Sequence, residues 1–198
     1  SEIAAVEDHI ADATSRELNR RLYGPHPYAR LVLGESSTVE SLTREDLAAY
    51  HRRVCIPRNA VLAVVGPIRR EALQALLDST LSAWTTNGRA APSRPQEFGV
   101  AVRVGQEIVH LQKKFQQGYL MIATLAPPVG SPDAPALKLA SAMLGGGMSS
   151  RLFMTLRERY GLGYELAAVY PSKMETSKFV SYIGVDPSQL DAAYRLMM

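Results

Sequence analysis

Apolar positions in the first 84 residues recur mainly at helical spacing. The pattern over residues 3–22 predicts a helix, and Gly24-Pro25 ends it because proline cannot continue a helix. A second predicted helix follows Thr43, a good N-cap residue, and a third covers residues 73–84. Between the last two, the continuous apolar run Ala60–Gly66 predicts a buried strand.

The second half mixes strand and helix patterns. Val100–Leu111 and Gly118–Leu125 are predicted strands, and Ser131-Pro132-Asp133 begins a helix that three consecutive glycines, Gly145–Gly147, end. The remaining elements are a helix through Leu152, Phe153 and Leu156, strands near Tyr164–Tyr170 and Phe179–Val185, and a last helix that Asp186-Pro187 begins. This order predicts the α+β class, with a largely antiparallel sheet and helices packed on one face.

Residues 85–99 carry Gly and Pro breaks and almost no apolar pattern, which predicts a linker. We therefore expect three parts: residues 1–84, the linker 85–99, and residues 100–198. The first and last predicted helices reach the two ends of the sequence, and we interpret the chain as part of a longer protein.

Composition narrows the class of protein. The 198 residues are 46% apolar and 21% charged, which excludes disordered and fibrous chains, and the single cysteine, Cys55, excludes an internal disulfide. No apolar stretch approaches the roughly 20 residues of a membrane helix. The net charge of +3 comes from residues 100–198, but the basic residues occur as isolated pairs, so we expect neither nucleic-acid nor membrane binding.

No local motif for metal or phosphate chemistry is present. The four histidines, at positions 9, 26, 51 and 110, form no H-E-x-x-H or H-x-x-E-H pattern, and one cysteine cannot form C-x-x-C. Glycine patterns that bind phosphates are also missing. The residues alone therefore predict no catalytic apparatus and no metal cofactor in this chain.

The most specific segment is Leu144–Tyr164, LGGGMSSRLFMTLRERYGLGY. Its three glycines either let a ligand approach the backbone closely or simply make a tight connection between two helices. Arg157 and Tyr164 flank Gly161 and Gly163, so both side chains could project from one helix–strand elbow and donate hydrogen bonds to a developing oxyanion. Alternatively, Arg157 complements the helix dipole and Tyr164 packs in the sheet.

This segment resembles the second-repeat motif of the insulinase family, which includes pitrilysin and the mitochondrial processing peptidase. The resemblance extends to HPYARLVLG (26–34), LTREDLAAYHRR (42–53), PRNAVLAVVG (57–66) and the strand at 117–127, in the family's order. It implies two similar α+β repeats facing each other around a chamber. The first repeat would bind zinc through H-x-x-E-H and a distant glutamate, and its zinc would activate the attacking water.

The resemblance also implies roles for named residues. Arg157 and Tyr164 match an arginine and a tyrosine that contact substrate near the scissile bond, and Gly145, Gly146 and Gly147 match a loop associated with substrate handling. Glu2 falls near the position of the distant zinc glutamate, although an ordinary surface glutamate fits equally well. The resemblance makes residues 1–84 the tail of the first, zinc-type repeat and residues 100–198 the second, non-zinc repeat with its C-terminal end truncated. The motif H-x-x-E-H is not in this chain, so zinc would be held upstream or by a partner.

The resemblance favours the non-catalytic, substrate-binding part of an insulinase-like zinc metallopeptidase, inactive alone. Its partners would be a peptide substrate and a zinc-bearing repeat or subunit. The alternative is an inactive partner subunit or assembly scaffold of the same family. Bacterial relatives occur in the cytoplasm and in the periplasm, so the sequence leaves the compartment open.

Overall fold

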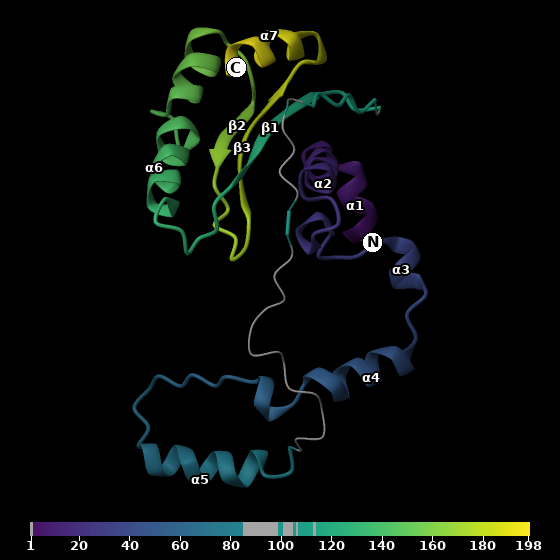
Figure 1. The fold of residues 1–198 in the computed structure, drawn as a ribbon, viewed down its shortest axis with the longest axis vertical. Coiled ribbons are helices and arrows are strands. Elements are labelled where there is room, and N and C mark those ends of the chain that lie inside the picture. The colour runs from purple at the N-terminus through teal and green to yellow at the C-terminus, as the bar shows by residue number, and fades with distance from the viewer. Residues whose placement is uncertain (1, 85–98, 101–104, 106, 113) are drawn as a thin grey trace. The chain divides into compact units, whose positions relative to one another are not determined.

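The computed structural model describes all residues except 1, 85–98, 101–104, 106 and 113 (Figure 1). The chain forms two compact units, Ser1–Glu35 with Glu97–Met198, and Ser36–Gln96. The predicted division into repeats at residues 85–99 stays a prediction, since most of that stretch lies outside the described residues. Within the described part, no helix combines the length and the apolar character needed to cross a membrane.

A three-stranded antiparallel sheet organises the first unit. Its strands are β1 (Gly118–Ala126), β2 (Glu165–Val169) and β3 (Ser177–Val185), in the order β1-β3-β2. Ile183 of the central strand lies opposite Leu120 on one side and Leu166 on the other. These three apolar side chains therefore point to the same face of the sheet, because the side chains of paired residues share a face.

That face carries the core. Ile183 and Val185 are fully buried against Leu156 and against α7 (Leu190–Met197), whose Ala193 is also fully buried. A second cluster joins Ala126 and Tyr170 to the start of α6 (Ala134–Gly145). The ribbon shows α6 running along this face of the sheet (Figure 1). The α+β class predicted from the sequence is confirmed.

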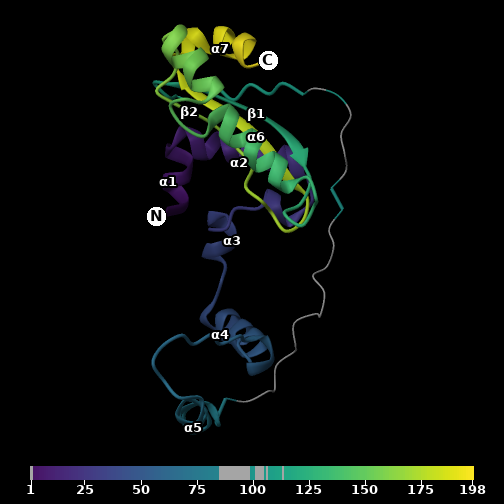
Figure 2. The same cartoon turned by 90° about the vertical axis from the view of Figure 1, so that its left-hand side faces the viewer.

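The opposite face of the sheet is also covered, by α2 (Ile10–Tyr23), which follows the short helix α1 (Glu2–Asp8). Lys178 of β3 points to this face and donates a 2.6 Å hydrogen bond from Nζ to Oδ1 of Asn19 in α2. Figure 1 shows α6 and α2 on opposite sides of the strands, and in Figure 2 α6 lies in front of the strands. The sequence predicted helices on one face of the sheet only, and the structure differs because α2 covers the second face as well.

A buried histidine ties the segment after α2 to the loop before β3. His26 is only 1% exposed, and its Nε2 lies 2.9 Å from Oε2 of Glu175. Its Nδ1 accepts a 3.0 Å hydrogen bond from the amide of Tyr28, at the short 3-10 turn Pro27–Ala29. The HPY sequence therefore folds as an anchor that places α2 against the sheet.

The second unit contains α3 (Ser36–Glu40), α4 (Arg44–Val54), a 3-10 turn at Pro57–Asn59 and α5 (Arg70–Leu81). Thr43 is the N-cap of α4, as predicted, in a capping box: its hydroxyl accepts from the amide of Asp46, whose carboxylate accepts from the amide of Thr43. The Asp46 carboxylate accepts hydrogen bonds from both the hydroxyl and the amide of Thr43, and these two bonds lower the pKa of Asp46. The helix starts where the sequence indicated.

Two predicted strands differ from the structure. The prediction of a buried strand at Ala60–Gly66 is wrong for this chain, because no segment of the described part pairs with it and Val61 and Val65 are about fully exposed, at 97% and 101%. The prediction for Val100–Leu111 is not met at residues 107–111, which have no strand partner, whereas residues 101–104 and 106 lie outside the described residues.

Candidate functional site

The predicted site lies where a wide helical turn leads into β2. Residues Phe153–Arg159 form a π-helix, with the amide of Tyr160 donating to the carbonyl of Thr155, five residues back. π-Helical turns are rare and occur often at functional sites, since the extra residue per turn changes the direction of the side chains that follow. Leu156 anchors this turn in the core with no exposed surface.

Arg157 and Tyr164 meet at this elbow. The Arg157 Nη1 donates a 2.9 Å hydrogen bond to the main-chain carbonyl of Tyr164, and both residues are exposed, Tyr164 by 75%. The alternative in which Tyr164 packs inside the sheet does not match this exposure. The structure brings the two predicted residues together, while their roles toward a substrate stay predictions.

The turn between them depends on a glycine. Gly163 has φ +83°, a conformation that side chains with a Cβ rarely adopt, and a Cβ there would lie 2.7 Å from Ile183. The next amide, of Tyr164, donates 3.0 Å to the carbonyl of Gly184 in β3. The elbow is therefore fixed to the sheet at Tyr164, directly before β2, which holds the start of β2 next to Arg157.

The three glycines of the loop differ in their surroundings. Gly145 is the last residue of α6, and a Cβ there would lie 1.9 Å from the amide nitrogen of Ala168 in β2. Gly146 and Gly147 are exposed, and Gly147 has open space around it and φ +153°. Gly145 thus serves close packing of α6 on β2, whereas Gly146 and Gly147 present backbone to solvent. Substrate binding by the loop remains a prediction.

An aromatic ring under Arg157 was not identified from the sequence, where Phe153 counted only as part of an apolar helix face. The Arg157 Cζ lies 5.6 Å from the centroid of the Phe153 ring. The signal was available, because residues four apart on a helix are neighbours and arginine stacks on aromatic faces.

Tyrosines on the α2 side of the sheet surround Glu165, which follows Tyr164. The rings of Tyr119 and Tyr182 stack with centroids 5.9 Å apart. Burial, with the nearby charge of Glu165, raises the pKa of both phenols above its ordinary value. Tyrosines are already neutral at neutral pH, so the shift means only that these two phenols add no negative charge beside Glu165 even in alkaline solution.

The described side chains offer no cluster of metal ligands. Among the described residues, no group of three or more His, Cys, Asp or Glu side chains could hold a metal ion. Glu2 begins α1, but its side chain lies outside the described part of the structure. The side chains that the structure describes do not form a zinc site, and zinc binding by another repeat or subunit stays a prediction.

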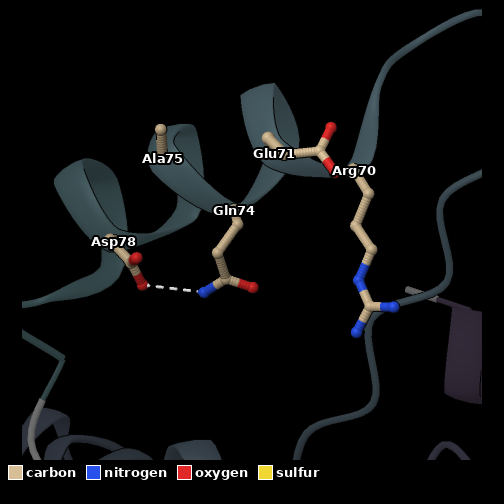
Figure 3. Close-up of a pocket in the computed structure, with 5 residues that line it drawn as sticks. All are labelled: Arg70, Glu71, Gln74, Ala75 and Asp78. Atoms are coloured by element: carbon tan, nitrogen blue, oxygen red, sulfur yellow. Dashed lines mark hydrogen bonds between the residues drawn. The ribbon is translucent and has the colours of Figure 1, made fainter.

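A hollow in the second unit is unrelated to the predicted site residues. Figure 3 shows it along α5, lined by Arg70, Glu71, Gln74, Ala75 and Asp78, with Gln74 Nε2 donating 2.9 Å to Asp78 Oδ1. All its walls come from one exposed helix, so it lacks the converging polar groups of a binding site.

Comparisons with known proteins agree with the fold. The model of the family described as the peptidase M16 inactive domain matches residues 41–198. An uncharacterized zinc protease of Mycobacterium bovis is 30% identical over 83% of this chain, which covers 37% of that protein. The uncharacterized zinc protease YmxG of Bacillus subtilis is 26% identical over 96% of this chain, which covers 44% of that protein.

A solved structure is also similar, that of a peptidase M16 inactive domain from Pseudomonas fluorescens. It is 26% identical with a TM-score of 0.81, over 98% of this chain and 46% of the other. The chain spans less than half the length of each of these relatives. Since the family model covers well over half of the chain, this protein belongs to the peptidase M16 inactive-domain family, as the resemblance to the insulinase family predicted.

Proposed function

We propose that this chain is the substrate-binding, non-catalytic part of an insulinase-like zinc metallopeptidase. In the complete enzyme, Arg157 and Tyr164 contact the peptide near the scissile bond, and the exposed backbone at Gly146 and Gly147 lies along the substrate. The relatives named as zinc proteases support the class of enzyme. The chain alone is inactive in this proposal, because it has no H-x-x-E-H motif.

The observation that carries the proposal is the elbow itself. An exposed guanidinium and an exposed phenol extend from a helix end and a strand start that one 2.9 Å hydrogen bond holds together. A guanidinium has five N–H donors, and the bond to the Tyr164 carbonyl uses one of them. The others, with the phenolic hydroxyl, are suited to stabilise negative charge that develops on a peptide carbonyl.

Exposed apolar side chains of the second unit favour a partner protein that covers them. Within the described residues of this unit, large apolar side chains are exposed on α4, on the extended segment and on α5: Leu47, Tyr50, Val61, Leu62, Val65 and Leu76. Val61, Leu62 and Val65 lie within one extended segment, and an exposed apolar run of this kind favours an interaction site. We assign this surface to a zinc-bearing repeat or subunit, the partner that the proposed enzyme requires.

Two substitutions test the proposal in the complete enzyme, this chain together with its zinc-bearing repeat. We expect Arg157→Ala and Tyr164→Phe each to lower the turnover of a peptide by about 10²-fold, as the loss of one oxyanion donor does. Arg159→Ala is the matched control, because it removes the same charge from the same helix, where Arg159 lies over Tyr160 instead. Wild-type turnover in both test variants would contradict the proposed roles and favour an assembly role.

A further inference from the structure

We propose that Phe153 is a positioning residue for Arg157, an inference that rests on the function proposed above. The guanidinium is held on two sides: its Nη1 donates to the Tyr164 carbonyl at 2.9 Å, and its Cζ lies 5.6 Å from the Phe153 ring centroid. An aromatic face attracts a cation at this range through its negative quadrupole. The ring therefore limits how the guanidinium can turn about its one hydrogen bond.

The position of Phe153 favours this role over a role in the core. Leu152 and Leu156, on either side of it, pack into the cluster around Ile183, but Phe153 belongs to neither core cluster of the described residues. Its side chain is only partly buried. Because the Phe153 ring belongs to neither core cluster, we assign its role to the contact with the Arg157 guanidinium.

The consequence for catalysis is one of orientation. An arginine on a surface has a long side chain with many rotamers, and fixing it before substrate arrives reduces the entropy lost on binding the transition state. One hydrogen bond leaves rotation about its own axis open, and the ring restricts this rotation. Phe153 thus acts through Arg157 and does not touch the substrate.

The decisive test keeps the shape of the ring and weakens its electrostatic attraction. Phenylalanines with one, two and three ring fluorines at position 153 of the complete enzyme withdraw electron density stepwise while changing the volume little. We expect kcat to fall progressively, by about fivefold or more at three fluorines, with KM within twofold. A ring that only fills space would leave kcat unchanged across the series, and that result would overturn the inference.

Ordinary substitutions provide a second measurement. We expect Phe153→Leu to lower kcat about fivefold or more. Phe153→Tyr keeps the aromatic face, so we expect its kcat to stay close to that of the wild type. Met154→Leu is the matched control, because Met154 is an exposed neighbour on the same helical turn. Equal losses in the leucine and tyrosine variants would overturn the inference.

These experiments distinguish a failure of the Phe153 inference from a failure of the proposed function. If Arg157→Ala lowers turnover and the fluorinated series does not, the proposed function stands and the role of Phe153 is wrong. If Arg157→Ala leaves turnover unchanged, the proposed role of Arg157 is wrong, and the role of Phe153, which depends on it, is wrong with it. If Phe153→Leu does not fold, the fluorinated series still decides, because it preserves the packing.

Discussion

Lys178 is a buried residue whose ionisation the fold changes. It is 9% exposed, and its Nζ donates to a neutral acceptor, Oδ1 of Asn19. Burial, with the nearby charge of Lys173, lowers its pKa to about 8. An ammonium group in this environment loses hydration without gaining a carboxylate, so folding favours its neutral form.

This shift predicts the sign of a pH dependence. The pKa of Lys178 is 10.5 before folding and about 8 after it, so the unfolded chain binds more protons between these values. We expect the free energy of unfolding of the first unit to rise as the pH increases from about 8 to 10.5. Below pH 8 the buried ammonium of Lys178 is charged, and its destabilisation of the fold is fully present. Urea unfolding across this range measures the rise.

Lys178→Met should remove this rise, whereas Lys138→Met, at an exposed position of α6, should keep it. An unchanged rise in the Lys178 variant would contradict the assignment. Each variant removes one ammonium group, so the difference between their pH dependences isolates the contribution of the buried one.

At the residue scale the glycines between Arg157 and Tyr164 allowed the two side chains to meet, and the family resemblance favoured this alternative over separate structural roles. The sequence did not predict which group Arg157 would contact. The hydrogen bond goes to the Tyr164 carbonyl and the ring beneath it is Phe153. Main-chain acceptors carry no signal in the sequence, and Phe153 was masked by its apolar neighbours.

At the scale of elements, α6 and β2 approach each other so closely that Gly145 has no room for a side chain. A Cβ there would lie 1.9 Å from the amide nitrogen of Ala168 and 2.6 Å from the carbonyl carbon of Ala167. Both are main-chain atoms, which cannot turn aside as a flexible side chain does. The glycine is required for this helix to lie on this strand.

We therefore expect Gly145→Ala to lower the free energy of unfolding by about 1–3 kcal/mol, the usual cost of overpacking. Chemical denaturation with the near-UV signal of the tyrosines measures the change. Gly130→Ala is the matched control, because a Cβ at Gly130 has open space around it, and it should change stability by less than about 0.5 kcal/mol. Equal stability of the two variants would contradict the packing argument.

Elements with a clear local signal were predicted well. The helix after Thr43 begins at its cap, and the strand predicted at Gly118–Leu125 matches β1 to within one residue. Ala60–Gly66 has the composition of a buried strand and still forms none. A strand exists only through hydrogen bonds to a neighbour, and the local sequence does not report whether that neighbour is present.

At the scale of the whole chain, the two units differ in how far they bury their apolar residues. Strand β3 holds Ile183 and Val185 with no exposed surface, whereas among the described residues of the second unit only Ile56 is buried. Burial of apolar surface is the main favourable term in folding. The α+β class followed from the order of elements, but this imbalance could not, because it depends on which surfaces meet.

Amide hydrogen exchange tests the imbalance. The amides of residues 61–66 have no main-chain acceptor within the described part of the chain, so we expect them to exchange within seconds. The amides of β3, the central strand, should be protected by several orders of magnitude. Addition of the zinc-bearing repeat should slow exchange at 61–66, and slow exchange in this chain alone would contradict the expected exposure.

The wide turn at Phe153–Arg159 has a consequence for how sequences of this kind can diverge. Each residue of a helix rotates the next side chain by about 100°, so one residue more or fewer moves a side chain to another face. Losing a single residue from this turn would tighten it into an ordinary α-helix and swing the guanidinium away from the strand, although every motif residue would still be present. Length over these seven positions is thus as strict a requirement as identity.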